Sequence, residues 1–183
     1  MTTQAASSSP AARPVLADEA SPRTGAPELC VVVPIRNEGA HVWPLVFGLR
    51  TALGTLSTEV LFVDDSDDET PTVVRGVAEL MSDGKSDFRV RLLQRDPARR
   101  HGGRAGAVEE GMSQTDATYI VVMDSDLQHR PSLIPVLLEH LRNGADVVIP
   151  GSRVEQDLEA LPGFFGMTRA ALSAPTLNVV ELP

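Results

Sequence analysis

The chain has 183 residues, which is enough for one domain with a hydrophobic core and too few for two domains of ordinary size. Its formal net charge is −9, so it lacks the basic excess with which nucleic-acid-binding proteins meet phosphates, and we expect no nucleic-acid partner. Cys30 is the single cysteine, which excludes an intrachain disulfide and is compatible with a reducing compartment.

The first 28 residues are rich in Ala, Ser, Pro and Thr and predict a disordered tail. They contain no apolar core segment of the kind found in a secretory signal. The most apolar later stretch, residues 161–180, is interrupted by Pro162 and Pro175 and carries Arg169, so we expect no transmembrane segment in this chain. These features predict a cytoplasmic protein.

From Leu29 onward, strand and helix patterns alternate along the chain. In chain order, the expected elements are a strand over 29–35, a helix over 41–53, a strand over 59–65, a helix over 70–81, a strand over 88–95, a helix over 102–112, a strand over 119–124, a helix over 131–144 and a strand over 146–153. Strands that are apolar throughout are buried on both faces. The pattern therefore predicts an α/β fold, with a mostly parallel sheet and helices on both of its faces.

Polar residues follow each expected strand. In a parallel sheet, ligands bind beyond the carboxyl ends of the strands, so these residues are expected to converge on one site. They are Arg36, Asn37 and Glu38 after the first strand, Asp64 and Asp65 after the second, 95–104 after the third, Asp124 and Asp126 after the fourth and Arg153 after the fifth.

The run YIVVMDSDLQHRP places Asp124 and Asp126 directly after an apolar strand. Carboxylates at i and i+2 leaving a strand can point the same way and can hold Mg²⁺ or Mn²⁺, with positions left open for phosphate oxygens. Gln128 offers a neutral oxygen to the same ion. The alternative is that the acidic residues only form a turn and cap the helix beginning at Pro131.

The segment RDPARRHGGRAGAVEEG surrounds Gly102 and Gly103 with arginines, and it opens a helix. Glycine lets the backbone approach a ligand closely, and a helix N-terminus favours anions. A solvated arginine loop explains the same residues equally well. The segment is neither a dinucleotide-binding G-x-G-x-x-G motif nor a phosphate-binding G-x-x-x-x-G-K-[ST] loop.

Five motifs together carry a family resemblance: VVVPIRNEG, EVLFVDDSDDET, GGRAGAVEEGM, YIVVMDSDLQHRP and GADVVIPGSR. Their order and spacing over 29–153 resemble the family-2 glycosyltransferases, most of all the polyprenol-phosphate mannosyl- and glucosyltransferases related to dolichol-phosphate mannose synthase. The resemblance implies the GT-A fold for residues 29–153 as a nucleotide-sugar-binding domain.

The resemblance also implies roles for individual residues. The expected nucleotide-sugar-binding residues are Pro34, Arg36, Glu38, Val63, Asp65, Gly103 and Arg104. The expected ligands of Mg²⁺ or Mn²⁺ are Asp124, Asp126 and Gln128, and the expected catalytic residues are Asp124, Asp126 and Arg153. Arg36 stands where the family usually has tyrosine, which weakens any stacking contact expected there.

The reaction implied is metal-dependent, inverting transfer of a hexose from a nucleotide-diphosphate sugar of the GDP-mannose or UDP-glucose type. The acceptor would be a polyprenol phosphate, so the protein would lie at the cytoplasmic face of a membrane. Its phosphate oxygen is already anionic, so a protein base is not required.

Residues 154–183 are expected to be a shortened acceptor-side remnant. Within them, EALPGFFGMTRAAL resembles the family's later D-P-x-S-G-F-F element, although an unrelated tail is the alternative. The incomplete C-terminal part leaves a second functional hypothesis, a truncated, non-catalytic nucleotide-sugar-binding remnant. A third, a phospho-acceptor signalling domain, is prompted by Asp64 and Asp65. That class places its acid pair after the first strand, unlike this chain.

Overall fold

The apolar runs of the sequence pair side by side in a single sheet. The computed structural model describes residues 16–17, 25–82, 87–151 and 163–182. The strands are β1 (Leu16–Ala17), β2 (Leu29–Ile35), β3 (Thr58–Asp64), β4 (Phe88–Gln94), β5 (Tyr119–Met123), β6 (Val147–Pro150), β7 (Phe164–Thr168) and β8 (Val179–Leu182). The helices are α1 (Gly39–Leu53), α2 (Thr70–Met81), α3 (Gly103–Ser113) and α4 (Ile134–Arg142), with 3₁₀ turns η1 (Pro97–Arg99), η2 (Pro131–Leu133) and η3 (Arg169–Ser173).

The sheet has the strand order β1-β4-β3-β2-β5-β7-β6-β8. Strands β4, β3, β2 and β5 are parallel to one another, with Val31 of β2 paired to Val60 of β3 and to Val121 of β5. β7 runs antiparallel to both β5 and β6, β8 is parallel to β6, and β1 is antiparallel to β4. The predicted mostly parallel sheet is therefore confirmed.

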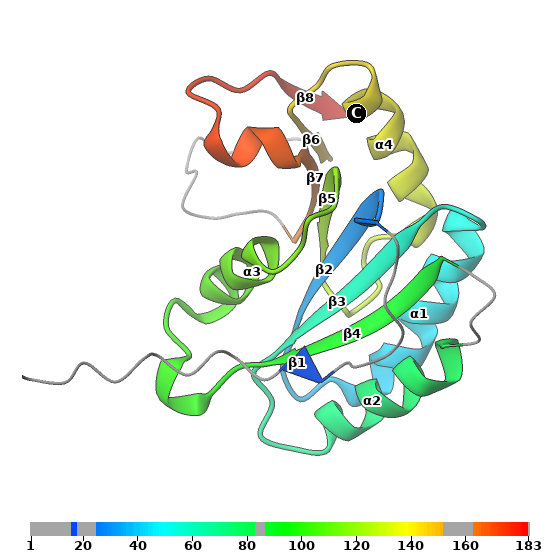
Figure 1. Cartoon of the computed structure of the whole chain (residues 1–183), viewed down its shortest axis with the longest axis vertical. Coiled ribbons are helices and arrows are strands. Elements are labelled where there is room, and N and C mark those ends of the chain that lie inside the picture. The colour runs from blue at the N-terminus through cyan, green and yellow to red at the C-terminus, as the bar shows by residue number, and fades with distance from the viewer. Residues whose placement is uncertain (1–15, 18–24, 83–86, 152–162, 183) are drawn as a thin grey trace, which may run out of the picture.

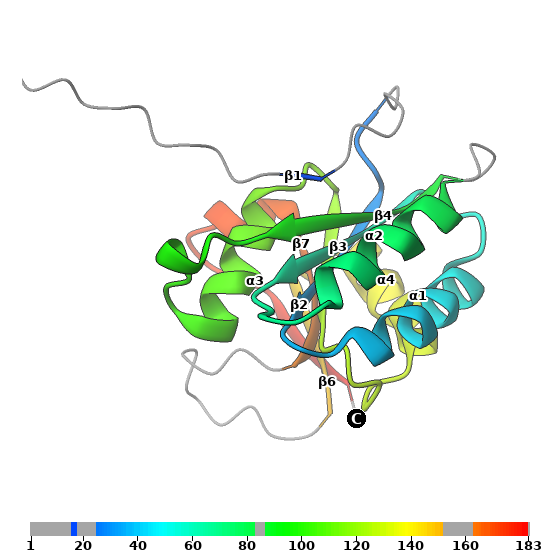
Figure 2. The same cartoon turned by 90° about the horizontal axis from the view of Figure 1, so that it is seen from below.

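Helices cover both faces of the sheet, as predicted (Figures 1 and 2). Helices α1, α2 and α4 lie on one face, and their buried side chains pack with Val31 and Val33 of β2. Helix α3 lies on the other face, where Cys30 and Val32 of the same strand pack. Every residue of β2 and β3 is buried, because alternate side chains enter two different cores.

The antiparallel strand β7 is the main departure from the simple β-α alternation. It comes from the GFFGMT stretch and occupies the position between β5 and β6. Because β7 pairs with β5 along its length, residues just before it reach the carboxyl end of β5. The boundary at residue 153 for the nucleotide-sugar-binding unit stays a prediction, while residues 164–168 belong to the same sheet.

A buried ion cluster joins β3 to β4 on the α3 face. Glu59 is 1% exposed, and its carboxylate accepts hydrogen bonds from Arg89 and from Arg91, the latter at 2.8 Å. Cys30 lies beside it, wholly buried as its sequence context predicted, and burial raises the pKa of its thiol well above the ordinary value. None of the helices described is long and apolar enough to cross a bilayer.

Candidate functional site

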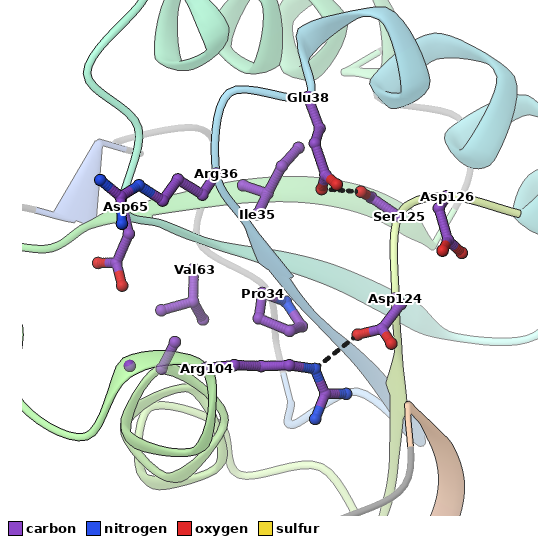
Figure 3. A pocket seen from close by; sticks show the side chains of 12 residues that line it. Pro34, Ile35, Arg36, Glu38, Val63, Asp65, Arg104, Asp124, Ser125 and Asp126 are labelled. Atoms are coloured by element: carbon purple, nitrogen blue, oxygen red, sulfur yellow. Dashed lines mark hydrogen bonds and ion pairs between the residues drawn. The ribbon is translucent and has the colours of Figure 1, made fainter.

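The polar residues that follow the strands gather around one cavity at the carboxyl edge of the sheet. The cavity has a volume of about 350 Å³. Its lining residues are Pro34, Ile35, Arg36, Glu38, Val63, Asp65, Gly103, Arg104, Ala107, Asp124, Ser125 and Asp126. They come from the ends of β2, β3 and β5 and from the first turns of α3, so the parallel strands bring together residues up to 92 positions apart (Figure 3).

The turn after β5 presents two carboxylates to this cavity. Asp124 accepts a hydrogen bond from the Arg104 guanidinium, with 2.8 Å between Nε and Oδ1. Ser125 between the acids is buried, and its hydroxyl donates to the Glu38 carboxylate (Figure 3). Glu38 therefore ties the loop after β2 to the turn that carries Asp124 and Asp126.

The carboxylate of Asp65 is held by two arginines from the segment after β4. Arg95, only 3% exposed, donates from Nη1 to Oδ2 of Asp65 at 2.9 Å and also pairs with Glu110 of α3 at 3.0 Å. Arg100 lies 3.5 Å from Oδ1 of Asp65 and donates to its backbone oxygen at 2.7 Å. The two arginines thus fix the orientation of the Asp65 carboxylate, and both of its oxygens already lie near a guanidinium group.

The loops after β2 and β3 are bonded to each other at the rim of the cavity. The backbone of Asn37 has φ 57°, a left-handed conformation that asparagine tolerates better than most residues. Its N–H donates to the Ser66 hydroxyl, and its side-chain oxygen accepts from the N–H of Asp67, each at 2.9 Å. Arg36 extends outward to Asp67 at 3.1 Å, which agrees with a surface contact in place of an aromatic stack.

Asp64 precedes Asp65 but does not line the cavity. It is completely buried, and burial raises the pKa of its carboxyl group above the ordinary value. Its Oδ1 accepts from the N–H of Ser66, whereas Oδ2 has no hydrogen-bond partner among the described residues. The acid pair therefore divides its roles: Asp65 faces the cavity and Asp64 supports the turn beneath it.

The glycine-rich segment begins α3 at the cavity wall. Gly103 has φ 53°, a conformation that strains residues with a Cβ, and it places Arg104 on the first turn of the helix. The helix N-terminus and the Arg104 guanidinium thus face the same space as the two carboxylates, which provides a place for an anion next to a place for a cation.

The expected convergence of strand-end residues is observed. The predicted site residues found in the cavity lining are Pro34, Arg36, Glu38, Val63, Asp65, Gly103, Arg104, Asp124 and Asp126. Gln128 is the exception, because it is exposed and does not line the cavity. The physical reason is Leu127, whose φ of 61° reverses the extended path on which the i, i+2 expectation depended. Arg153 lies outside the described residues.

Gly163 is a residue of the site that sequence reasoning missed. Its carbonyl accepts a hydrogen bond from the backbone N–H of Asp124 at 2.9 Å, directly before β7 begins. A Cβ at this position would lie 2.1 Å from Oδ2 of Asp124. The match of the GFF stretch to the family's later element was the available signal, but nothing in the sequence showed that this glycine contacts the first acid of the DSD turn.

The donor set fits a divalent cation only in part. Asp124 and Asp126 offer hard carboxylate oxygens in one cavity, the ligand type that Mg²⁺ and Mn²⁺ prefer. Across the described ranges, no group of three or more His, Cys, Asp or Glu side chains gathers closely enough to hold a metal ion. A cation held by two carboxylates would have further coordination positions left for oxygens of a bound diphosphate.

The mostly parallel sheet, with helices on both faces and a cavity at its carboxyl edge, is the architecture expected of the GT-A class. In agreement with that class, the profile described as "Glycosyl transferase family 2" matches residues 30–163, and the chain belongs to this family. Membership in this family explains Asp64 and Asp65 after β3, so the hypothesis of a phospho-acceptor signalling domain is not needed.

Curated relatives give the same grouping. The chain is 34% identical over 126 residues to a dolichol-phosphate mannosyltransferase of Pyrococcus furiosus, covering 69% of this chain and 33% of the relative. It is 30% identical over 137 residues to the dolichol-phosphate mannosyltransferase of Saccharomyces cerevisiae, covering 71% of this chain and 48% of the relative. The chain thus spans about a third to a half of the length of these relatives.

Solved structures share the fold at low sequence identity. The mannosyltransferase PcManGT from Pyrobaculum calidifontis, in complex with GDP-Man and Mn²⁺, superposes with a TM-score of 0.66 at 18% identity, covering 87% of this chain and 56% of that one. Glucosyl-3-phosphoglycerate synthase from Mycobacterium tuberculosis, in complex with Mn²⁺, UDP and glucosyl-3-phosphoglycerate, superposes with a TM-score of 0.59 at 20% identity, covering 79% of this chain and 57% of that one.

Proposed function

We propose that this protein is a glycosyltransferase that moves a hexose from a nucleotide-diphosphate sugar to a polyprenol phosphate, with a divalent cation and inversion at the anomeric carbon. The observation that carries the proposal is the single cavity in which Asp65, Arg104 and the carboxylates of Asp124 and Asp126 meet. Family membership and the names of the relatives support the reaction class.

Different lining residues of the cavity would bind different parts of the donor. Asp65, fixed by Arg95, would accept hydrogen bonds from the base or ribose, beside the apolar surfaces of Pro34 and Val63. The N-terminus of α3, with Gly103 and Arg104, would receive the diphosphate.

Asp124 and Asp126 would hold Mg²⁺ or Mn²⁺ against that diphosphate. When bound, the cation supplies Lewis-acid neutralisation of the charge that develops on the leaving nucleotide diphosphate. Glu38 lines the same cavity and bonds to Ser125 of this turn, so it would position the two carboxylates in addition to the donor contact expected of it. The roles expected for Gln128 as a ligand and Arg153 as a phosphate contact remain predictions.

The acceptor proposal rests on the named relatives. Dolichol-phosphate mannosyltransferases and undecaprenyl-phosphate 4-deoxy-4-formamido-L-arabinose transferases both carry a polyprenol phosphate in their names. A lipid acceptor would require the open side of the cavity to approach a membrane surface, and peripheral association with the cytoplasmic face is part of the proposal. The acceptor's phosphate oxygen would attack the anomeric carbon while the bond to the nucleotide diphosphate breaks.

Donor binding tests the first half of the proposal. We expect isothermal titration with GDP-mannose and with UDP-glucose to detect binding of one donor that depends on Mn²⁺. Asp124→Asn and Asp126→Asn should each weaken that binding about tenfold or more, because each removes an anionic ligand of the cation. Asp116→Asn is the matched control, since this exposed acid pairs with Arg169 away from the cavity. Binding indifferent to Mn²⁺, or equal loss in the control, would contradict the proposal.

Transfer tests the second half. Incubation of the protein with the radiolabelled donor, Mn²⁺ and polyprenol phosphate in detergent should yield labelled lipid that is lost in Asp124→Asn. Donor binding without labelled lipid would instead support the alternative of a nucleotide-sugar-binding protein without transferase activity.

A further inference from the structure

Arg104 forms an ion pair with Asp124, the carboxylate that the proposed function assigns to a metal ion. It reaches across the cavity from the first turn of α3, and its Nε lies 2.8 Å from Oδ1 of Asp124 (Figure 3). Both side chains are 36% exposed, so the pair sits at the cavity wall where solvent and ligands can reach it. A divalent cation on Asp124 would stand beside this guanidinium, and the two positive charges would repel each other at such short range.

Asp124 is the less mobile partner in this pair. Its backbone is bonded to the Gly163 carbonyl at 2.9 Å, and its Oδ2 lies against the Cα of Gly163, where no side chain could fit. Arg104 has a long side chain with several rotatable bonds and begins at a helix end. If one partner must move when a cation arrives, it is therefore Arg104.

The surrounding charges explain why a cationic partner stands there before any ligand binds. Asp124, Asp126 and Glu38 contribute carboxylates to the same part of the cavity, while Asp65 is already paired with Arg95 and Arg100. Arg104 offsets part of this negative charge. A nucleotide diphosphate offers the guanidinium a new anionic partner, since arginine binds phosphate oxygens in a bidentate manner.

We propose that Arg104 is an exchange residue: it pairs with Asp124 in the ligand-free protein and moves to the donor's diphosphate when Asp124 takes up the divalent cation. The inference rests on the proposed function and adds a consequence to it. A cation alone must displace Arg104 from Asp124, whereas a diphosphate bound together with the cation offers the displaced guanidinium new phosphate oxygens. Binding of the two is therefore cooperative, and the coupling is reciprocal.

The test is the affinity for Mn²⁺ with and without nucleotide, read from the electron paramagnetic resonance signal of free Mn²⁺, which requires no turnover. GDP and UDP are the two nucleotide probes. In the wild-type protein we expect the better nucleotide to tighten Mn²⁺ binding within the range usual for coupled sites, about 5- to 150-fold. Arg104→Met should bind Mn²⁺ alone about fivefold or more tightly than the wild type, and the coupling should fall by at least that factor, to the part that direct contact between cation and diphosphate provides. Arg104→Gln carries the same expectation and guards against a folding defect of the first variant.

Arg75→Met is the matched control for charge. Arg75 is exposed on α2, donates to the Gln94 side chain at 2.8 Å and does not line the cavity, so its loss removes one positive charge without releasing Asp124. It should change the affinity for Mn²⁺ alone by less than about twofold, as expected for a partner exposed to solvent.

The outcomes separate this inference from the proposed function. If the wild type binds a nucleotide in an Mn²⁺-dependent way but Arg104→Met binds Mn²⁺ alone no more tightly, the exchange is refuted and the proposed function stands. The same holds if the Arg104 variants keep the full coupling. If neither nucleotide binds the wild type with Mn²⁺, both fail.

Discussion

Replacement of Gly163 by alanine tests whether the residue before β7 holds the turn that carries Asp124 and Asp126 in place. A Cβ at residue 163 would lie 2.1 Å from Oδ2 of Asp124, whereas contacts shorter than 3.0 Å essentially never occur for real Cβ atoms. One of the two groups must therefore move by about 0.9 Å or more. The carboxylate is the end of a short, partly exposed side chain, so it yields more readily than the backbone of β7, which is paired to β5 along its length.

The expected effect falls on ligand binding more than on stability. Overpacking of a core costs about 1–3 kcal/mol, and we expect about 1 kcal/mol here because the displaced group can turn toward solvent. A displacement of about 1 Å of a reacting or positioning group can reduce catalytic efficiency about 100-fold. Gly163→Ala should therefore lower the catalytic efficiency of sugar transfer about 100-fold and weaken Mn²⁺-dependent donor binding in parallel, while the thermal midpoint changes by only a few degrees.

Gly166→Ala is the control, since it lies in β7 itself but away from Asp124. A Cβ there would meet side-chain atoms of Leu141, Leu137 and Val121 at 3.3–3.5 Å, which the core can accommodate with small shifts. Titration calorimetry for donor binding, labelled-product assay for transfer and differential scanning calorimetry for stability separate the effects. Donor affinity equal to wild type in Gly163→Ala, or equal losses in both variants, would refute the role of this contact.

Two further predictions concern buried charges. Glu59→Ala should lower the free energy of unfolding by about 3 kcal/mol, because it leaves Arg89 and Arg91 without their shared carboxylate. Chemical denaturation measures this loss, and Glu79→Ala, at an exposed position, is the control. A loss as small as that of the control would contradict the prediction. For Asp64, burial raises the pKa above its ordinary value of 3.8, so the folded state binds the proton more tightly than the unfolded state and stability declines as pH rises from about 4 through the raised pKa. Asp64→Asn should flatten the fall in unfolding free energy between pH 4 and pH 8, and an unchanged slope would show that this carboxyl group does not titrate as described.

Much of the cavity was predictable because it depends on local rules. The run LCVVVPI and the VLFV centre of EVLFVDD are apolar at every position, as expected for strands covered on both faces, and such strands belong to parallel sheets. Parallel strands end at a common edge, so the residues after them meet whatever the strand order is. This reasoning placed Asp65 and Asp124 in one cavity although they come from different strands.

Other features depend on contacts between distant segments, which no local pattern encodes. The DSD turn predicted that Gln128 would join Asp124 and Asp126, but Gln128 follows the left-handed backbone at Leu127 and does not line the cavity. The charge pattern of β4 did not reveal that Arg89 and Arg91 meet a buried Glu59 from the neighbouring strand. Periodicity reports which face a residue occupies, but partners across a sheet follow from strand order and register.

The amino-acid sequence by itself determined the family, the β-α order and the set of acidic and basic side chains at the carboxyl edge of the sheet. These follow from hydrophobic periodicity and from motifs whose members are close along the chain. Only the tertiary structure decided that β7 enters between β5 and β6, that Gly163 lies against Asp124 and that Arg104 pairs with the same carboxylate. The contacts of Asp124 with Arg104 and with Gly163 join residues 20 and 39 positions apart, and their geometry is set by the packing of whole strands and helices.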